Sequence, residues 1–193
     1  MRNEFANDSL RTTVAMTFHQ TRLPGVFEIE IEPKPDDRGF FARCWCRNEF
    51  ESHGLTSSPA QCSLSFNTRK GTLRGVHYQA EPYAETKLIR CTRGTIYDVV
   101  VDLRRHSPTF KGWIGVLLNA ANHKMLYVPE GCGHGFLTLE DETEVLYQMS
   151  EFHHAESARG VRWDDPAFQI VWPGEAEVIS ERDRTYPNFE STR

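Results

Sequence analysis

Residues 86–103 read TKLIRCTRGTIYDVVVDL, two short apolar runs separated by Arg93 and Gly94. Val, Ile and Thr are favoured in strands, and glycine is typical of the turn between them. The segments 86–92 and 95–103 are therefore predicted to be two consecutive strands.

The same pattern extends along the chain in both directions. Further runs of about five to nine residues lie at 26–32, 39–45, 60–66, 72–79, 113–119, 124–129, 135–139 and 143–150, and Gly, Pro, Asn or Asp separates most of them. Many short strands at this spacing predict a mainly β antiparallel sandwich or barrel rather than alternating α/β units.

Outside these runs, two short helices are predicted. One covers RNEFESHGL and ends at Gly54, and the other lies near the C-terminus, with Ser180 as its N-cap and Asp183 three residues later. Residues 1–20 show no periodicity, so we expect a flexible N-terminal extension followed by one domain over residues 21–193.

The composition argues against several classes of protein. A net charge of −5 does not suit a nucleic-acid partner, and no apolar stretch approaches the length of a membrane span. The acidic start lacks the apolar core of a secretory signal. Five cysteines are an odd number, which favours free thiols in a reducing cytoplasm. Cys44-x-Cys46 would place two thiols on one face of a strand, but no second pair completes a zinc site.

The predicted strands carry an unusual number of polar side chains. Each one alone would suit the outer face of a sheet, but together, among dense apolar neighbours, they favour a polar cavity inside a barrel. These residues are Gln61, Ser63, Arg74, His77, Lys87, Asp98, His134 and Tyr147.

Two of these histidines lie next to glycines. Arg74 and His77 in RGVHYQ would alternate faces in a regular strand, unless Gly75 supplies a bulge. His134 lies between two glycines in PEGCGHGF, which allows a ligand to approach the backbone closely. A thiol–imidazole pair of Cys132 and His134 is an alternative interpretation.

A metal site is not expected. A metal-binding strand would carry His-x-His and a following Glu, but Gln79 stands two residues after His77, and no such set follows His134. His153 and His154 are adjacent and would point to opposite faces of a strand. Without three convergent ligands, the pattern does not predict a metal.

Taken together, the motifs resemble those of the dTDP-4-dehydrorhamnose 3,5-epimerase family over about Phe27 to Asp183. They occur in family order: DDRGFF, LRGVHYQ, KLIRCTRGTIYDVVVDLR, SPTF, VPEGCGHGF, VLY, WDDP and IVWP. The resemblance implies a jelly-roll cupin without metal or cofactor, forming a homodimer with site residues shared across the interface. It also implies an isomerase that moves protons beside the 4-keto group of a nucleotide-linked 6-deoxyhexose in deoxysugar biosynthesis.

The resemblance assigns roles by position. His77 matches the base, Asp183 the carboxylate that orients it, Lys87 the cation for the enolate oxygen, and Tyr147 the acid for the return proton. Arg74 matches a diphosphate ligand. The further substrate-binding positions are Gln61, Ser63, Arg38, Phe40, Arg43, His134, Asp98, Phe152, His153 and Arg182.

The chain departs from the family pattern at residues that would contact the nucleotide. Arg43 stands where an acidic residue is usual, Ser63 for Asn, His153 for Tyr and Ala158 for Glu. Arg43 has donors only and cannot accept the N3–H of thymine, whereas cytosine and guanine present acceptors. A CDP- or GDP-linked sugar therefore remains an alternative to the dTDP form.

The reaction also has alternatives. A 3- or 5-monoepimerase and a sugar-nucleotide ketoisomerase would use the same groups. A non-catalytic jelly roll that binds a sugar nucleotide is the non-enzyme alternative. The retained base and acid favour an enzyme, because binding alone needs neither.

Overall fold

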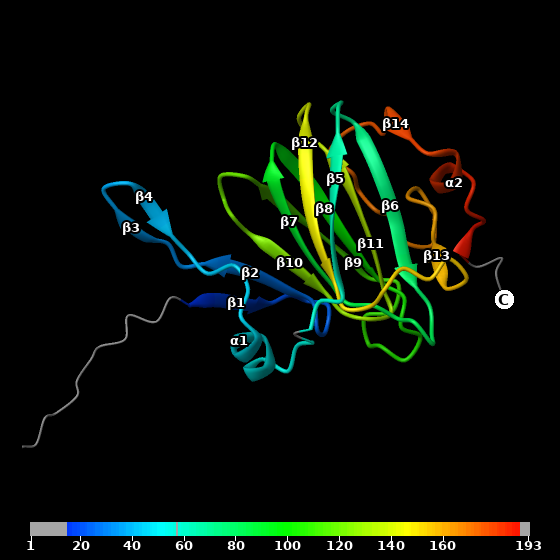
Figure 1. Cartoon of the computed structure of the whole chain (residues 1–193). Helices are drawn as coiled ribbons and strands as arrows, with labels where there is room; N and C mark the ends of the chain where they lie inside the picture. The colour runs from blue at the N-terminus through cyan, green and yellow to red at the C-terminus, as the bar shows by residue number, and fades with distance from the viewer. Residues whose placement is uncertain (1–14, 57, 190–193) are drawn as a thin grey trace, which may run out of the picture.

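The computed structural model describes residues 15–56 and 58–189. Two sheets face each other, and every strand predicted from the apolar runs is present (Figure 1). Except for one short parallel pair, the paired strands are antiparallel, which confirms the predicted jelly roll.

The first sheet has the strand order β1-β2-β10-β7-β12-β5. Its strands are β1 (Met16–Gln20), β2 (Phe27–Ile31), β5 (Gln61–Asn67), β7 (Lys87–Arg93), β10 (Met125–Val128) and β12 (Thr143–Met149). Met16–Gln20 pair with β2, so these five residues belong to the sheet rather than to the N-terminal extension expected over residues 1–20. Residues 1–14 of that expected extension lie outside the described residues.

The second sheet has the order β13-β6-β11-β8-β9, and β14 pairs with β6 in parallel. Its strands are β6 (Thr72–Gln79), β8 (Thr95–Asp102), β9 (Trp113–Asn119), β11 (Cys132–Thr138), β13 (Ala158–Gly160) and β14 (Val178–Ile179). Helix α2 (Glu181–Arg184) follows β14, and Ser180 caps it by accepting from the backbone N–H of Asp183, as predicted.

Alternating side chains of both sheets fill the space between them. Ile89 of β7 and Val145 of β12 meet Ile96 of β8 and Phe136 of β11 in one fully buried cluster. Burying a side chain of this size contributes about 1.5–3 kcal/mol, so this cluster fixes the distance between the two sheets.

The only α-helix before β5 in the described residues, α1 (Arg47–Ser52), covers the outer face of the first sheet. Its Phe50 is buried against Met125 and Tyr127 of β10. The predicted strand 39–45 is shorter than expected: β4 (Gly39–Phe41) pairs with β3 (Lys34–Asp36) in a hairpin that projects from the sheets (Figure 1). Cys44 and Cys46 follow it outside any strand, so they are not two thiols on one strand face.

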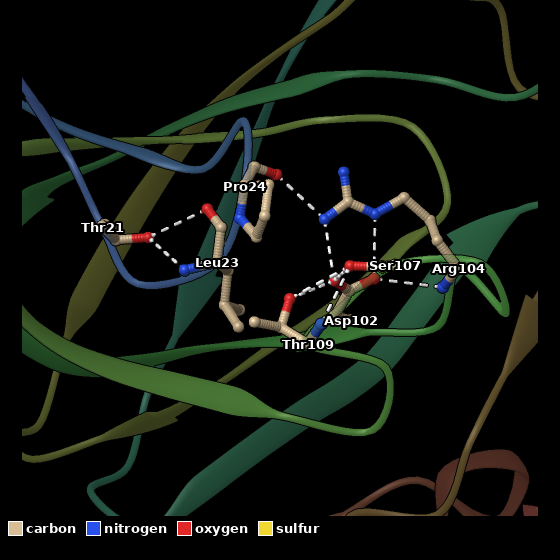
Figure 2. Close-up of polar contacts among 7 residues, drawn as sticks. All are labelled: Thr21, Leu23, Pro24, Asp102, Arg104, Ser107 and Thr109. Atoms are coloured by element: carbon tan, nitrogen blue, oxygen red, sulfur yellow. Dashed lines mark hydrogen bonds and ion pairs between the residues drawn. The ribbon is translucent and has the colours of Figure 1, made fainter.

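A buried carboxylate at the end of β8 ties together three segments of the chain (Figure 2). Asp102 Oδ1 accepts from Arg104 Nε at 2.8 Å, and Oδ2 accepts from Ser107 Oγ at 2.5 Å and Thr109 Oγ1 at 2.6 Å. Arg104 also donates to the carbonyl of Pro24 at 2.9 Å. This network fixes the turn between β8 and β9 against the turn that precedes β2.

Candidate active site

A cavity of about 650 Å³ opens beside the apolar core. Of the polar strand residues expected to surround a cavity, all except Asp98 line it. His153, Arg182 and Asp183 line it as well. The prediction of a polar cavity is therefore confirmed.

Strand alternation places the first-sheet residues in the cavity. On β5, Gln61 and Ser63 line the cavity, whereas Leu64 and Phe66 point to the opposite, exposed face. Tyr147 of β12 lies in register with Ser63, so the tyrosine joins this inner row. Period-two alternation explains why small polar and large apolar residues follow each other here.

A bulge in β6 brings Arg74 and His77 to the same cavity. His77 pairs with His134 and Arg74 pairs with Phe136, so Gly75 and Val76 together oppose the single residue Gly135. Gly75 has φ 131°, and a Cβ atom there would lie 2.4 Å from the Cα of Gly135. Only glycine fits this position, which confirms the bulge predicted at Gly75.

His77 forms a dyad with Asp183. Its Nε2 lies 2.6 Å from Asp183 Oδ1, and the backbone N–H of Gly75 donates to Oδ2 at 3.2 Å. Burial would raise the pKa of the Asp183 carboxyl, but the hydrogen bond and charge of His77, with the Gly75 N–H, lower it overall. An ionised Asp183 only accepts, so His77 Nε2 carries the proton and Nδ1 is the basic nitrogen.

Lys87 and Tyr147 enter from the opposite sheet. Lys87 begins β7, and its Nζ lies 3.4 Å from the carbonyl oxygen of His77 and 3.2 Å from Glu85 Oε1. Burial raises the pKa of Tyr147 well above its ordinary value, so the phenol stays protonated and able to donate. Sequence reasoning missed Glu85, because it lies in the loop before β7 and outside the strand pattern.

A second histidine–carboxylate pair lies deeper in the structure. His134 Nε2 is 2.7 Å from Asp98 Oδ1, and both side chains are buried. Burial raises the pKa of Asp98, and the charge of His134 opposes this rise. The ring of His134 packs edge-on against the ring of Tyr147, with 5.8 Å between the ring centroids. Asp98 was expected in the pocket, but it lies behind His134.

Amide side chains hold the rim in place. Arg74 Nε donates to Asn67 Oδ1 at 2.8 Å, and Asn67 in turn donates to the carbonyl of Thr143. Gln79 Nε2 donates to the carbonyls of Tyr83 and Phe152, at 3.0 and 3.1 Å. The amide at the end of RGVHYQ therefore joins the loop between β6 and β7 to the segment that follows β12. Asn67 was not predicted as a site residue, because its place at the end of a strand is its only signal.

Several predicted site residues lie elsewhere in this chain. Arg38 and Phe40 lie on the β3–β4 hairpin, exposed to solvent, and Phe152 is also exposed. Arg43 Nη1 pairs with Glu49 Oε1 of α1 at 2.5 Å. None of these four residues lines the cavity of its own chain.

Cys132 and His134 do not form the alternative thiol–imidazole pair, because the Cys132 thiol is not available as a nucleophile. Cys132 is buried in the apolar core, and burial raises the pKa of its thiol to about 12. A thiol with such a pKa carries almost no thiolate near neutral pH.

Within residues 15–56 and 58–189, no group of three or more His, Cys, Asp or Glu side chains is arranged to hold a metal ion. No helix in the same ranges has both the length and the apolar character to cross a membrane.

The chain is similar to characterised proteins over most of its length. The family model described as dTDP-4-dehydrorhamnose 3,5-epimerase matches residues 20–191. A dTDP-4-dehydrorhamnose 3,5-epimerase of Shigella flexneri is 41% identical over 169 residues, which cover 87% of this chain and 93% of the relative.

Solved structures agree with this similarity. The enzyme of that name from Bacillus anthracis, with TDP and PPi bound, has a TM-score of 0.86 and 42% identity, covering 90% of this chain and 99% of that one. A 3'-monoepimerase from Streptomyces bikiniensis, in complex with dTDP-quinovose, has a TM-score of 0.82 and 31% identity, covering 88% of this chain and 86% of that one. The fold, the cavity and these similarities together show that the chain belongs to the dTDP-4-dehydrorhamnose 3,5-epimerase family.

Proposed function

We propose that this chain is an epimerase that inverts C3, C5 or both in a nucleotide-linked 4-keto-6-deoxyhexose, as in dTDP-4-dehydrorhamnose. The observation that carries the proposal is the His77–Asp183 dyad at 2.6 Å, which faces a cavity that also holds Lys87 and Tyr147. The base comes from β6 in one sheet, and the cation and the acid come from β7 and β12 in the other. This arrangement suits proton removal on one face of a sugar ring and return on the other.

The proposed steps follow from these groups. His77 Nδ1 removes the proton beside the ketone, and the electron pair of the broken C–H bond moves onto the carbonyl oxygen. The Lys87 ammonium stabilises the resulting enolate, and Asp183 stabilises the imidazolium. Tyr147 then donates its proton to the carbon from the opposite face. Solvent reprotonates Tyr147 and deprotonates His77, so the net change is an inversion.

The substrate is proposed to be held by the polar lining beyond the dyad. Arg74, aligned by Asn67, suits a diphosphate because its planar guanidinium donates in pairs. Gln61, Ser63, His153 and Arg182 line the same cavity and would contact the rest of the nucleotide. The relatives named above support dTDP as the nucleotide, and the Arg43 substitution keeps CDP and GDP as alternatives.

We also propose a homodimer in which each hairpin completes the other subunit's site. Support comes from the exposed apolar side chains on the hairpin and on β5: Phe40 is 49%, Phe41 69%, Leu64 63% and Phe66 47% exposed. Exposed apolar side chains of this size, two on the hairpin and two on the edge strand β5, are typical of a protein contact. The free state of all five cysteines supports a cytoplasmic location.

The reaction is tested by proton exchange in D₂O. The dTDP-linked 4-keto-6-deoxyglucose is incubated with the enzyme, and NMR follows deuterium at C3 and C5 together with inversion. We expect deuterium at the inverted carbons, and a loss of about 100- to 10,000-fold or more in His77→Ala. Exchange that continues at a near-native rate in His77→Ala refutes the base assignment. Binding without exchange in the wild type points to the non-catalytic alternative, and movement of the carbonyl points to the ketoisomerase.

The shared site is tested by mixing subunits. Two variants are made: His77→Ala, and a double variant with Arg38 and Phe40 both changed to Ala. The homodimer of each variant is expected to have low epimerase activity. If the hairpin serves the partner's site, mixed dimers regain one intact site and therefore activity. A monomer by light scattering, or no gain on mixing, refutes the shared site.

A further inference from the structure

Glu85 is a buried acid inside the proposed active site. Its side chain is 8% exposed and lines the cavity, and its Oε1 lies 3.2 Å from Lys87 Nζ, on a side chain that is 11% exposed. A carboxylate and an ammonium are both costly to bury alone, and each becomes tolerable when the other is present.

The backbone around this pair is firmly held. Thr86, between the two residues, donates its N–H to Ser150 Oγ at 2.8 Å and accepts from the Ser150 N–H at 3.1 Å. Gln79 fixes the preceding loop through the carbonyl of Tyr83. Because Thr86, directly after Glu85, and Tyr83, two residues before it, are both anchored, the Glu85 carboxylate has a defined position relative to Nζ.

Other titratable groups line the same cavity: His77 on β6, His134 on β11 and Tyr147 on β12. Asp98 on β8 lies behind His134. Asp98 interacts electrostatically with Lys87, but its Oδ1 is bonded to His134. Glu85 is therefore the carboxylate in direct contact with Nζ.

We infer that Glu85 is a positioning residue that keeps the Lys87 side chain charged and aims one of its N–H groups at the substrate oxygen. The ammonium has three donors. Glu85 takes one and the His77 carbonyl faces a second, which leaves the third for the oxygen where negative charge develops. This inference rests on the proposed epimerase function.

The experiment compares Glu85→Gln and Glu85→Asp with Glu81→Gln, a control that removes an exposed charge from the same loop. Two readouts are taken on each protein. The first is the pH titration of the Lys87 ¹⁵Nζ resonance, which is assigned by its loss in Lys87→Arg. The second is the pH dependence of kcat and KM for deuterium exchange in the 4-keto sugar nucleotide.

In Glu85→Gln we expect Lys87 to lose its proton at lower pH, and the alkaline limb of the kcat profile to move with it. We also expect kcat to fall about 10- to 100-fold while KM stays within about twofold, because the contact acts on the developing charge. Glu85→Asp should keep the alkaline limb and lower kcat, since the charge remains but is displaced. Glu81→Gln should match the wild type.

An unchanged Lys87 titration and an unchanged kcat in Glu85→Gln overturn the inference. A rise in KM alone also overturns it, because Glu85 would then contact the bound nucleotide. If Glu85→Gln does not fold, Glu85→Asp decides, and an unchanged kcat there refutes positioning. If the wild type catalyses exchange but Glu85→Gln leaves the Lys87 titration unchanged, the proposed function stands and the pairing is refuted. If Glu85→Gln shifts the Lys87 titration but the wild type shows no exchange, the pairing is supported and the proposed function is refuted.

Discussion

Replacing Asp102 by Asn should destabilise the fold by an amount that depends on pH. Burial would raise the pKa of this carboxyl, but hydrogen bonds from Arg104, Ser107 and Thr109 lower it from the ordinary 3.8 to about 2. At about 1.4 kcal/mol per pH unit, this difference corresponds to about 2.5 kcal/mol of folding free energy. An asparagine keeps the shape but removes the charge, and its NH₂ group cannot accept from Arg104 (Figure 2).

The sign of the pH dependence follows from the lowered pKa. The native state favours the ionised form, so the stabilisation is complete above pH 4 and decreases as the pH falls from about 4 to about 2. Urea unfolding at a fixed protein concentration should therefore show Asp102→Asn less stable than wild type by about 2–3 kcal/mol at pH 7. The difference should decrease between pH 4 and pH 3.

Asp164→Asn is the matched control. Asp164 pairs with Arg162, also two residues away, but its side chain is 47% exposed. Exposed pairs contribute about 0–1 kcal/mol, so this variant should lose little stability at any pH. The reasoning is refuted if Asp102→Asn loses no more than Asp164→Asn, or if its loss is the same at pH 7 and pH 3.

Other predictions concern the cavity. Tyr147→Phe should slow inversion more than deuterium exchange, because His77 still removes the first proton; equal losses by NMR would place Tyr147 at an earlier step. A chelator should leave activity unchanged, while Lys87→Ala should lose about 100-fold or more; activity lost to the chelator and restored by a divalent ion would contradict this. In Gln79→Glu, the carbonyls of Tyr83 and Phe152 lose their donor and the buried side chain becomes an acid, so we expect a loss of about 2–3 kcal/mol by urea unfolding; native stability would show that the amide does not hold the loops. Calorimetry with dTDP, CDP and GDP on the wild type and Arg43→Glu tests the alternative nucleotides: CDP or GDP binding at least as well as dTDP in the wild type supports them, and a clear dTDP preference unchanged by the substitution ends that hypothesis.

The sequence predicted the strands well because alternation depends on burial of one face. It did not predict Met16–Gln20, in which Met16 is buried and Thr17 exposed but the signal is only five residues long. The two-residue strand β14 has no pattern of its own, and only its contact with β6 defines it.

The cavity was predictable where polar residues interrupt apolar strands, as at His77 and Tyr147. Glu85 and Asn67 were not, because each lies where a loop meets a strand, where charged and amide residues are common. Arg43 shows a different limit: the sequence identified the substitution, but not that Glu49 would pair with its guanidinium.

The bulge in β6 makes the site depend on a count of residues. Two residues oppose Gly135 between Arg74 and His77, and this extra residue turns the imidazole to the side of the arginine. Regular pairing of the same residues, without the bulge, would leave every letter of the strand in place, yet His77, three residues after Arg74, would face Val99 and Phe168 on the far side of the sheet, where Val76 now packs. Every catalytic side chain would still be encoded, and the base would be on the wrong side. Spacing between motifs is therefore as informative as their letters when related chains are compared for activity.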